Sequence, residues 1–180
     1  MALVLPFEGR HPRIADSVFL CPGAVVVGDV EIGDRSSVWF NTVIRGDVNS
    51  VSIGSRTNIQ DLCMLHVTNN RAALRVGSNV TIGHGAIVHG CTIHDEVLIG
   101  MGAKVLDHCV VGSQTIIAAG SVLPERATAP AGVLMAGVPA RVVRPLREEE
   151  FERFLQSAAA YVAYADRYRS DGTFPPVQPS

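Results

Sequence analysis

The chain has 180 residues, of which 47% are hydrophobic, and its 15 basic and 17 acidic side chains leave a formal net charge of −2. This composition supports one domain with a continuous core, and the balanced charge argues against nucleic acid or an anionic membrane as a partner. The first residues, MALVLPFEGR, contain too short an apolar run for a signal peptide core or a membrane span, so we expect a cytoplasmic protein.

Aliphatic residues recur at every sixth position, with two insertions and one shortened step. A unit of six residues is long enough for one short strand and a corner, so three units close one triangular coil. The series predicts about six stacked coils of a parallel β-solenoid. Its inward positions are Ile14, Leu20, Val26, Ile32, Val38, Ile44, Ile53, Ile59, Leu65, Val76, Ile82, Val88, Ile93, Ile99, Val105, Val111, Ile117 and Leu123.

A small or β-branched residue follows most of these positions by four residues and marks a second inward position. Cys63 and Cys109 fall in the same register, so we expect both to be buried. The four cysteines show no CxxC spacing, and nothing in the sequence indicates an oxidising compartment. The second series comprises Val18, Ala24, Val30, Ser36, Thr42, Thr57, Val80, Ala86, Thr92, Val97, Ala103, Thr115 and Ser121.

A different periodicity begins after Pro145. Apolar residues then recur at spacings of three and four, which predicts an amphipathic helix that packs along the solenoid or against a neighbouring subunit. We therefore expect a β-helix domain with an N-terminal lead-in over residues 1–145, a C-terminal helix over 146–170 and an extended tail over 171–180. The apolar positions of the helix are Phe151, Phe154, Leu155, Ala158, Val162 and Ala165.

Successive units lie on three faces of the solenoid, which we call a, b and c, and this assignment places the histidines. His66 and His89 each follow an inward residue of face c in adjacent coils, so they share one outward column, with Arg45 one coil earlier. His84 lies on face b, in a column with Asp61. A face is roughly 20 Å long, whereas zinc–nitrogen bonds are about 2.0 Å. If all three histidines bind one metal, the third must come from another chain.

The repeat over roughly residues 14–125 resembles the hexapeptide-repeat left-handed β-helix. The motifs VIRGD, NIQD, LHV and IGHGAIVHG, in this order, resemble the gamma-class carbonic anhydrases and their close relatives over nearly the whole chain. The resemblance implies left-handed coils and a homotrimer with a metal at each subunit interface, held by two histidines of one chain and one of the next. Carried onto this sequence, the ligands are His66, His84 and His89.

The resemblance also implies roles for residues around the metal. Arg45 and Asp47 match a structural and bicarbonate-associated pair, Gln60 and Asp61 match polar residues beside the metal-bound solvent, and Tyr161 matches a tyrosine near the site. Three neutral imidazoles leave an open position on zinc, which lowers the pKa of its water to about 7 and yields a hydroxide that can attack carbon dioxide. Imidazole ligands suit Zn²⁺, and also Fe²⁺ or Co²⁺.

Plainer interpretations stay open for these residues. Arg45 and Asp47 could form only an ion pair between subunits. Asp61 could orient a ligand histidine rather than act on solvent. Tyr161 lies on the apolar side of the predicted helix and could serve only in packing.

Three functions are compatible with the sequence. The first is reversible hydration of carbon dioxide to bicarbonate by a metal-dependent, gamma-class carbonic anhydrase-like enzyme. The second is acyl transfer from coenzyme A, because such hexapeptide enzymes also resemble the repeat and the segment GVPARVVR. The third is a metal-bearing accessory or structural trimer with weak activity. The stretches GDVNS and HVTNN carry no glutamate where the family places acidic residues for proton export, so that step would fall to buffer, water or another group.

Overall fold

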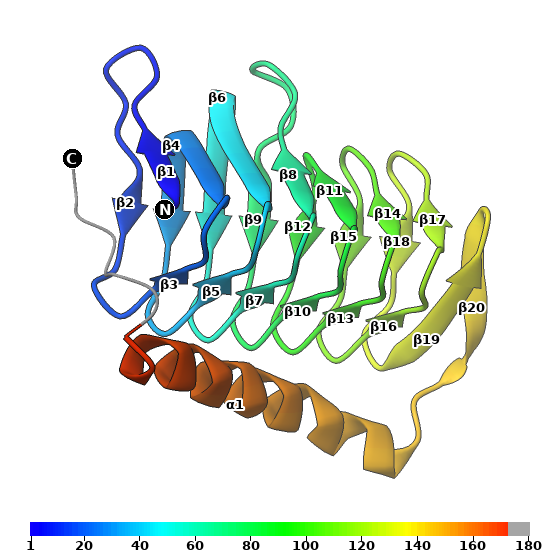
Figure 1. The fold of residues 1–180 in the computed structure, drawn as a ribbon. Helices are drawn as coiled ribbons and strands as arrows, with labels where there is room; N and C mark the ends of the chain where they lie inside the picture. The colour runs from blue at the N-terminus through cyan, green and yellow to red at the C-terminus, as the bar shows by residue number, and fades with distance from the viewer. Residues whose placement is uncertain (173–180) are drawn as a thin grey trace.

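The computed structural model describes residues 1–172 as a three-sided β-solenoid with one helix along its side (Figure 1). The eight strands of face b form one sheet, in the spatial order β20-β19-β16-β13-β10-β7-β5-β3. Their bounds are β3 (Phe19–Leu20), β5 (Ser37–Val38), β7 (Asn58–Ile59), β10 (Thr81–Ile82), β13 (Leu98–Ile99), β16 (Ile116–Ile117), β19 (Val133–Gly137) and β20 (Ala140–Pro145).

The other two faces form a single sheet of twelve strands. They are joined because β4 and β6 continue around the corner from face c to face a. The bounds are β1 (Leu3–Leu5), β2 (Arg13–Ile14), β4 (Val25–Ile32), β6 (Val43–Ile53), β8 (Met64–His66), β9 (Leu74–Val76), β11 (Ile87–His89), β12 (Thr92–Ile93), β14 (Lys104–Val105), β15 (Val110–Val111), β17 (Val122–Leu123) and β18 (Thr128–Ala129).

The strands of each face stack in parallel register, so equivalent positions of successive coils lie directly above one another. In face b, Ile82 of β10 pairs with Ile59 of β7 on one side and with Ile99 of β13 on the other. Every predicted inward aliphatic residue is buried except Ile14, which is half-buried in the first coil. Burying one such side chain contributes about 1.5–3 kcal/mol, and the continuous aliphatic column therefore accounts for the core.

The predicted fold class is confirmed, because the chain is mainly β, with a parallel solenoid followed by one helix. The solenoid is longer than the predicted six coils. Ala129 in β18 and Met135 in β19 continue the inward series and are 1% and 4% exposed. The aliphatic pattern missed them because neither residue is a branched aliphatic. After this added coil, β20 turns back and pairs antiparallel with β19.

The second inward series is buried as predicted at most positions, but Thr92 was wrongly assigned to it. Thr92 is half-buried, whereas Cys91 before it is 1% exposed. The step from Val88 to Ile93 is one residue short, so the inward position moves from Thr92 to the cysteine. Cys63 and Cys109 are both buried as expected, and all four cysteines are free thiols.

The helix α1 (Glu148–Ser170) runs beside the strands of face b (Figure 1). Its buried apolar residues are Phe154, Ala158 and Ala165, all at predicted positions. Leu155, which was predicted to be on the same apolar side, is 49% exposed, because it lies one residue past the line of buried side chains. The expected tail, residues 171–180, falls almost wholly outside the described residues.

Polar contacts fix both ends of α1. Glu150 accepts hydrogen bonds from the Arg144 guanidinium at 2.6 and 2.9 Å and from the backbone N–H of Arg147 at 2.8 Å. Near the other end, Asp166 pairs with Arg35 at 3.0 Å. The helix is therefore fastened to β20 at one end and to the second coil at the other. Within residues 1–172, no helix has the length and apolar character needed to cross a membrane.

Candidate metal centre

His66 and His89 are stacked neighbours at the ends of β8 and β11. The two strands are parallel and the two histidines are direct register partners, which confirms the predicted column. Nδ1 of His66 lies 3.1 Å from Nε2 of His89. Since a tetrahedral metal with bonds of about 2.0–2.1 Å separates two ligand nitrogens by roughly 3.3 Å, the spacing of this pair fits two ligands of one ion.

Each ring of this pair is held by a carboxylate on its other nitrogen. His66 Nε2 lies 3.1 Å from Oδ1 of Asp47, and His89 Nδ1 lies 2.5 Å from Oδ1 of Asp107. An ionised carboxylate only accepts hydrogen bonds, so these two ring nitrogens carry the protons. In neutral rings the facing nitrogens, His66 Nδ1 and His89 Nε2, then both present lone pairs. Two lone pairs at 3.1 Å repel each other unless a cation or an extra proton lies between them.

The surroundings of His66 disfavour the extra proton. Burial is the largest influence on this ring, and together with the nearby Arg45 charge it holds the pKa of His66 below its usual value, although Asp47 acts in the opposite direction. The ring therefore favours its neutral form near neutral pH. The donor set of this pair fits a divalent metal ion.

Asp47 joins the histidine column to Arg45. It forms an ion pair with the Arg45 guanidinium as well as the contact to His66. Burial acts to raise the pKa of Asp47, but hydrogen bonds from Arg45 and His66 outweigh it and hold the pKa below the usual range. The Arg45 side chain is 42% exposed, so its guanidinium can still meet an anion beside the histidines.

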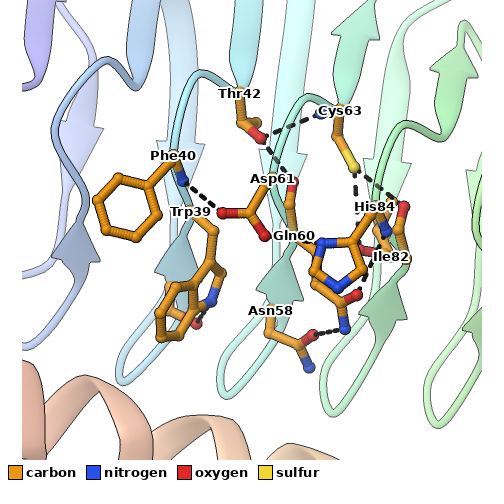
Figure 2. Close-up of polar contacts among 11 residues, drawn as sticks. Trp39, Phe40, Thr42, Asn58, Gln60, Asp61, Cys63, Ile82 and His84 are labelled. Carbon is orange, nitrogen blue, oxygen red and sulfur yellow. Dashed lines mark hydrogen bonds and ion pairs between the residues drawn. The ribbon is translucent and has the colours of Figure 1, made fainter.

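His84 lies on face b, just past the end of β10, and has a carboxylate of its own. Its Nδ1 lies 2.7 Å from Oδ2 of Asp61, which leaves the lone pair of the neutral ring on Nε2 (Figure 2). The backbone N–H of His84 donates to Gln60 Oε1 at 3.2 Å, and Gln60 Nε2 donates to Asn58 Oδ1 at 3.1 Å. Asp61 also accepts a hydrogen bond from the backbone N–H of Phe40 at 3.3 Å. The Gln60 amide thus supports the backbone that carries His84.

Tyr161 projects from α1 into an aromatic cluster beside His84. Its ring meets Trp39 edge-on, with centroids 5.4 Å apart. Burial, and then the negative charge of Asp61, raises the pKa of Tyr161 above its usual value. The cluster borders an open pocket of about 330 Å³, lined by Trp39, Phe40, Asp61, His84, Tyr161, Tyr164 and Tyr168. The tyrosine is both a packing residue and a part of the wall next to His84.

One chain does not bring the three predicted ligands together. His66 and His89 stack on face c, whereas His84 lies on face b, and across residues 1–172 no three His, Cys, Asp or Glu side chains converge on one metal position. The structure therefore groups the predicted site residues into two half-sites. Half-site one comprises Arg45, Asp47, His66 and His89; half-site two comprises Gln60, Asp61, His84 and Tyr161.

Two residues of the first half-site were missed in the sequence. They are Asp107, which binds His89, and Thr68, whose hydroxyl donates to Asp107 Oδ2 at 2.5 Å. The repeat gives no column signal for Asp107, because the shortened coil brings Val88 into register with Val105, so that Leu106 and not Asp107 is the equivalent of His89. Thr68 lies in an insertion that interrupts the repeat, so no column predicts its position.

Comparisons with known proteins identify the family of the chain. A family model described as bacterial transferase hexapeptide (six repeats) matches residues 11–46 and 90–125. The chain is 39% identical to a carbonic anhydrase of Geobacillus kaustophilus over 93% of this chain and 92% of that protein. The solved structure of a hexapeptide transferase family protein from Anaplasma phagocytophilum has a TM-score of 0.88 and 37% identity, covering 92% of this chain and 98% of that one.

A longer relative carries the same region. The chain is 41% identical to the mitochondrial gamma carbonic anhydrase 2 of Arabidopsis thaliana over 91% of its own length, but it spans only 61% of that protein. The cytoplasmic location expected from the sequence stays a prediction. The shared repeat, and an identity that extends over nearly the whole of the Geobacillus protein, show that the chain belongs to the gamma carbonic anhydrase family of hexapeptide-repeat proteins.

Proposed function

We propose that the protein is a metal-dependent enzyme that reversibly hydrates carbon dioxide to bicarbonate, at sites shared between the subunits of a homotrimer. The observation that carries this proposal is the 3.1 Å spacing of His66 Nδ1 and His89 Nε2, with a carboxylate on the other nitrogen of each ring. Two prealigned imidazole donors, with a third on His84 of a neighbouring subunit, form a set suited to Zn²⁺. The names of the relatives support the same activity.

The remaining residues have separate tasks in this proposal. Three histidine donors leave a coordination position open, and a bound zinc ion would supply water activated for attack at neutral pH. Asp47, Asp61 and Asp107 hold the outer nitrogens of the histidines, which keeps each inner lone pair available. Arg45, fixed by Asp47, is placed to bind the negative charge of bicarbonate.

Gln60 and Tyr161 border the second half-site. Gln60 uses its oxygen for the backbone N–H of His84 and one amide hydrogen for Asn58, so its second amide hydrogen is available to orient the attacking oxygen. Tyr161 lines the open pocket next to His84 and contributes to its aromatic wall. Neither residue needs to exchange a proton with substrate in this scheme.

The deciding experiment measures metal content and carbon dioxide hydration on one anaerobically prepared sample. We expect one divalent metal ion per subunit, a trimeric mass and hydration activity that is lost on chelation and restored by zinc. Anaerobic handling also separates Fe²⁺ from Zn²⁺ or Co²⁺ as the native ion. A folded, metal-free trimer that shows no hydration after zinc is added would overturn the proposal.

The structural neighbour described as a hexapeptide transferase supports acyl transfer as a second candidate. Titration with acetyl-coenzyme A in a calorimeter separates the two functions, because the hydration proposal predicts no saturable binding. A metal-loaded trimer with neither coenzyme A binding nor hydration would instead indicate an accessory role.

A further inference from the structure

The Asp107 carboxylate contacts two different coils. It lies two residues past β14, and its side chain is 15% exposed. Oδ1 accepts a hydrogen bond from His89 Nδ1 at 2.5 Å, and Oδ2 accepts one from the Thr68 hydroxyl at 2.5 Å. The proposed function requires His89 as a metal ligand. It does not by itself require that the Asp107 carboxylate also be held by a second residue.

The backbone leaves space for this carboxylate beside His89. Gly90 has a φ of +52°, and a Cβ at this position would collide with Asp107 Oδ1 and with the side chain of Ala72. The backbone N–H of His108 donates to Gly90 O at 2.8 Å, which holds the corner that carries Asp107 against the corner that follows His89. A glycine is therefore required where the carboxylate reaches the ring.

Thr68 is held in place by its own insertion and by strand β6. It opens the insertion between β8 and β9 (Figure 1), where its backbone pairs with Ala72. Its carbonyl accepts a hydrogen bond from Asn49 Nδ2 at 3.2 Å, and the backbone N–H of Asn70 donates to Val48 O at 3.3 Å. The hydroxyl that binds Asp107 thus belongs to a segment whose position is fixed by hydrogen bonds.

We propose that Asp107 is a positioning residue for His89 and that Thr68 orients Asp107. This inference rests on the proposed function, since it treats His89 as a metal ligand. The carboxylate fixes the proton of the neutral ring on Nδ1, so the lone pair of Nε2 faces His66. Without the carboxylate, the ring is free to carry its proton on Nε2, which removes that donor from the metal. The insertion then serves to align a ligand.

The first test reads the tautomer directly in the metal-free protein. Nitrogen-15 NMR of the imidazole rings should show His89 protonated on Nδ1 in the unmodified chain and shifted towards Nε2 protonation in Asp107→Ala. Asp95→Asn is the matched control, because the Asp95 carboxylate accepts from the backbone N–H of Ser78 at 2.7 Å rather than from a ring. This control should leave the His89 signals unchanged. A His89 ring that stays protonated on Nδ1 in Asp107→Ala would overturn the inference.

The second test measures zinc affinity by competition with a chelator. Asp107→Ala should weaken binding by about 10–100-fold, the range for losing the partner of a ligand histidine. Thr68→Val should weaken zinc binding less than Asp107→Ala does. Thr68→Ser should bind zinc as tightly as the unmodified chain, because the hydroxyl is retained. Equal losses in Asp107→Ala and Asp95→Asn, or in Thr68→Val and Thr68→Ser, would show a general structural effect and count against the inference.

The two proposals fail differently. An unmodified chain that folds but binds no zinc contradicts the proposed function, whereas the tautomer measurement on the same metal-free chain still decides the role of Asp107. If Asp107→Ala fails to fold, the zinc affinities of Thr68→Val and Thr68→Ser are compared instead, and thermal melting checks that both variants fold.

Discussion

Leu65 and His66 are neighbours in β8, yet their surroundings differ in kind. Leu65 is fully buried, with Ile44 and Val88 at equivalent positions in the adjacent coils. His66 points outward and depends on two specific atoms, one on Asp47 and one on His89. The inward column is redundant, since each residue has similar neighbours above and below. The outward column is not, because each polar side chain has its own partner.

This contrast predicts that a charge placed in the inward column has the largest effect. Ile82→Asp puts an unpaired carboxylate among fully buried aliphatics, which costs several kcal/mol and should prevent stable folding. Thermal melting and circular dichroism measure the loss. Ile82→Val should cost only about 0.5–1.5 kcal/mol. Arg75→Asp places the same charge outward, between buried Leu74 and Val76, and a comparable loss there would contradict the distinction between the columns.

Removing a proposed ligand should have the opposite effect to Ile82→Asp, because the metal is lost while the fold remains. His89→Ala should abolish most zinc binding and lower the stability of the metal-free protein by only about 1 kcal/mol. Metal analysis after desalting and melting with and without chelator separate the two effects. A loss of folding as large as that of Ile82→Asp would place His89 in the structural core.

Mixing two inactive variants tests whether the outward columns meet across subunits. His66→Ala and His84→Ala chains, each lacking metal, are dissociated and reassembled together. In a cyclic trimer containing both kinds, one interface combines intact His66 and His89 with an intact His84, so metal and activity should return there. If all three ligands came from one chain, mixing would restore nothing. Mixed trimers identified by mass but still free of metal would exclude a shared site.

Arg45→Ala should have a smaller and more selective effect than loss of a ligand. If the guanidinium binds the forming anion, hydration should fall by roughly 10²-fold while zinc occupancy remains. Arg45→Lys retains the charge without the planar fork and should recover part of the rate. Gel filtration tests the alternative role in assembly. Dissociation of the Arg45→Ala protein into monomers, with parallel loss of metal, would contradict the anion-binding role.

The smallest effect is expected at the start of α1, away from both columns. The hydrogen bonds from Arg144 and then from the Arg147 backbone lower the pKa of Glu150 from 4.5 to about 2. A depressed carboxylate pKa stabilises the fold above the ordinary pKa and loses this contribution as the pH falls towards 2. Glu150→Gln should therefore lower the melting temperature slightly near neutral pH, with the difference narrowing in acid. A difference that is independent of pH would show that the charge is not responsible.

The regular columns could be predicted from the sequence because one period places every inward residue. The same period also placed His66 beside His89 and His84 beside Asp61. Prediction failed where the period changes. Thr92 lies within the shortened step, and Thr68 lies in an insertion whose path depends on backbone hydrogen bonds rather than on a repeat. Asp107 lies one residue beyond the register equivalent of His89, at a corner where the direction of a side chain depends on the local backbone.

The antiparallel return of β20 along β19 also limits how the molecule can associate. A solenoid that ended on an open parallel strand would present a row of unpaired backbone groups, on which another copy could add its first coil and extend into a fibre. Reversing the chain gives that row a partner from within the molecule and presents the next copy with a strand of the opposite direction. On face b, a copy stacked in the same orientation would therefore meet a strand that runs the opposite way, so the parallel register of this face stops at β20.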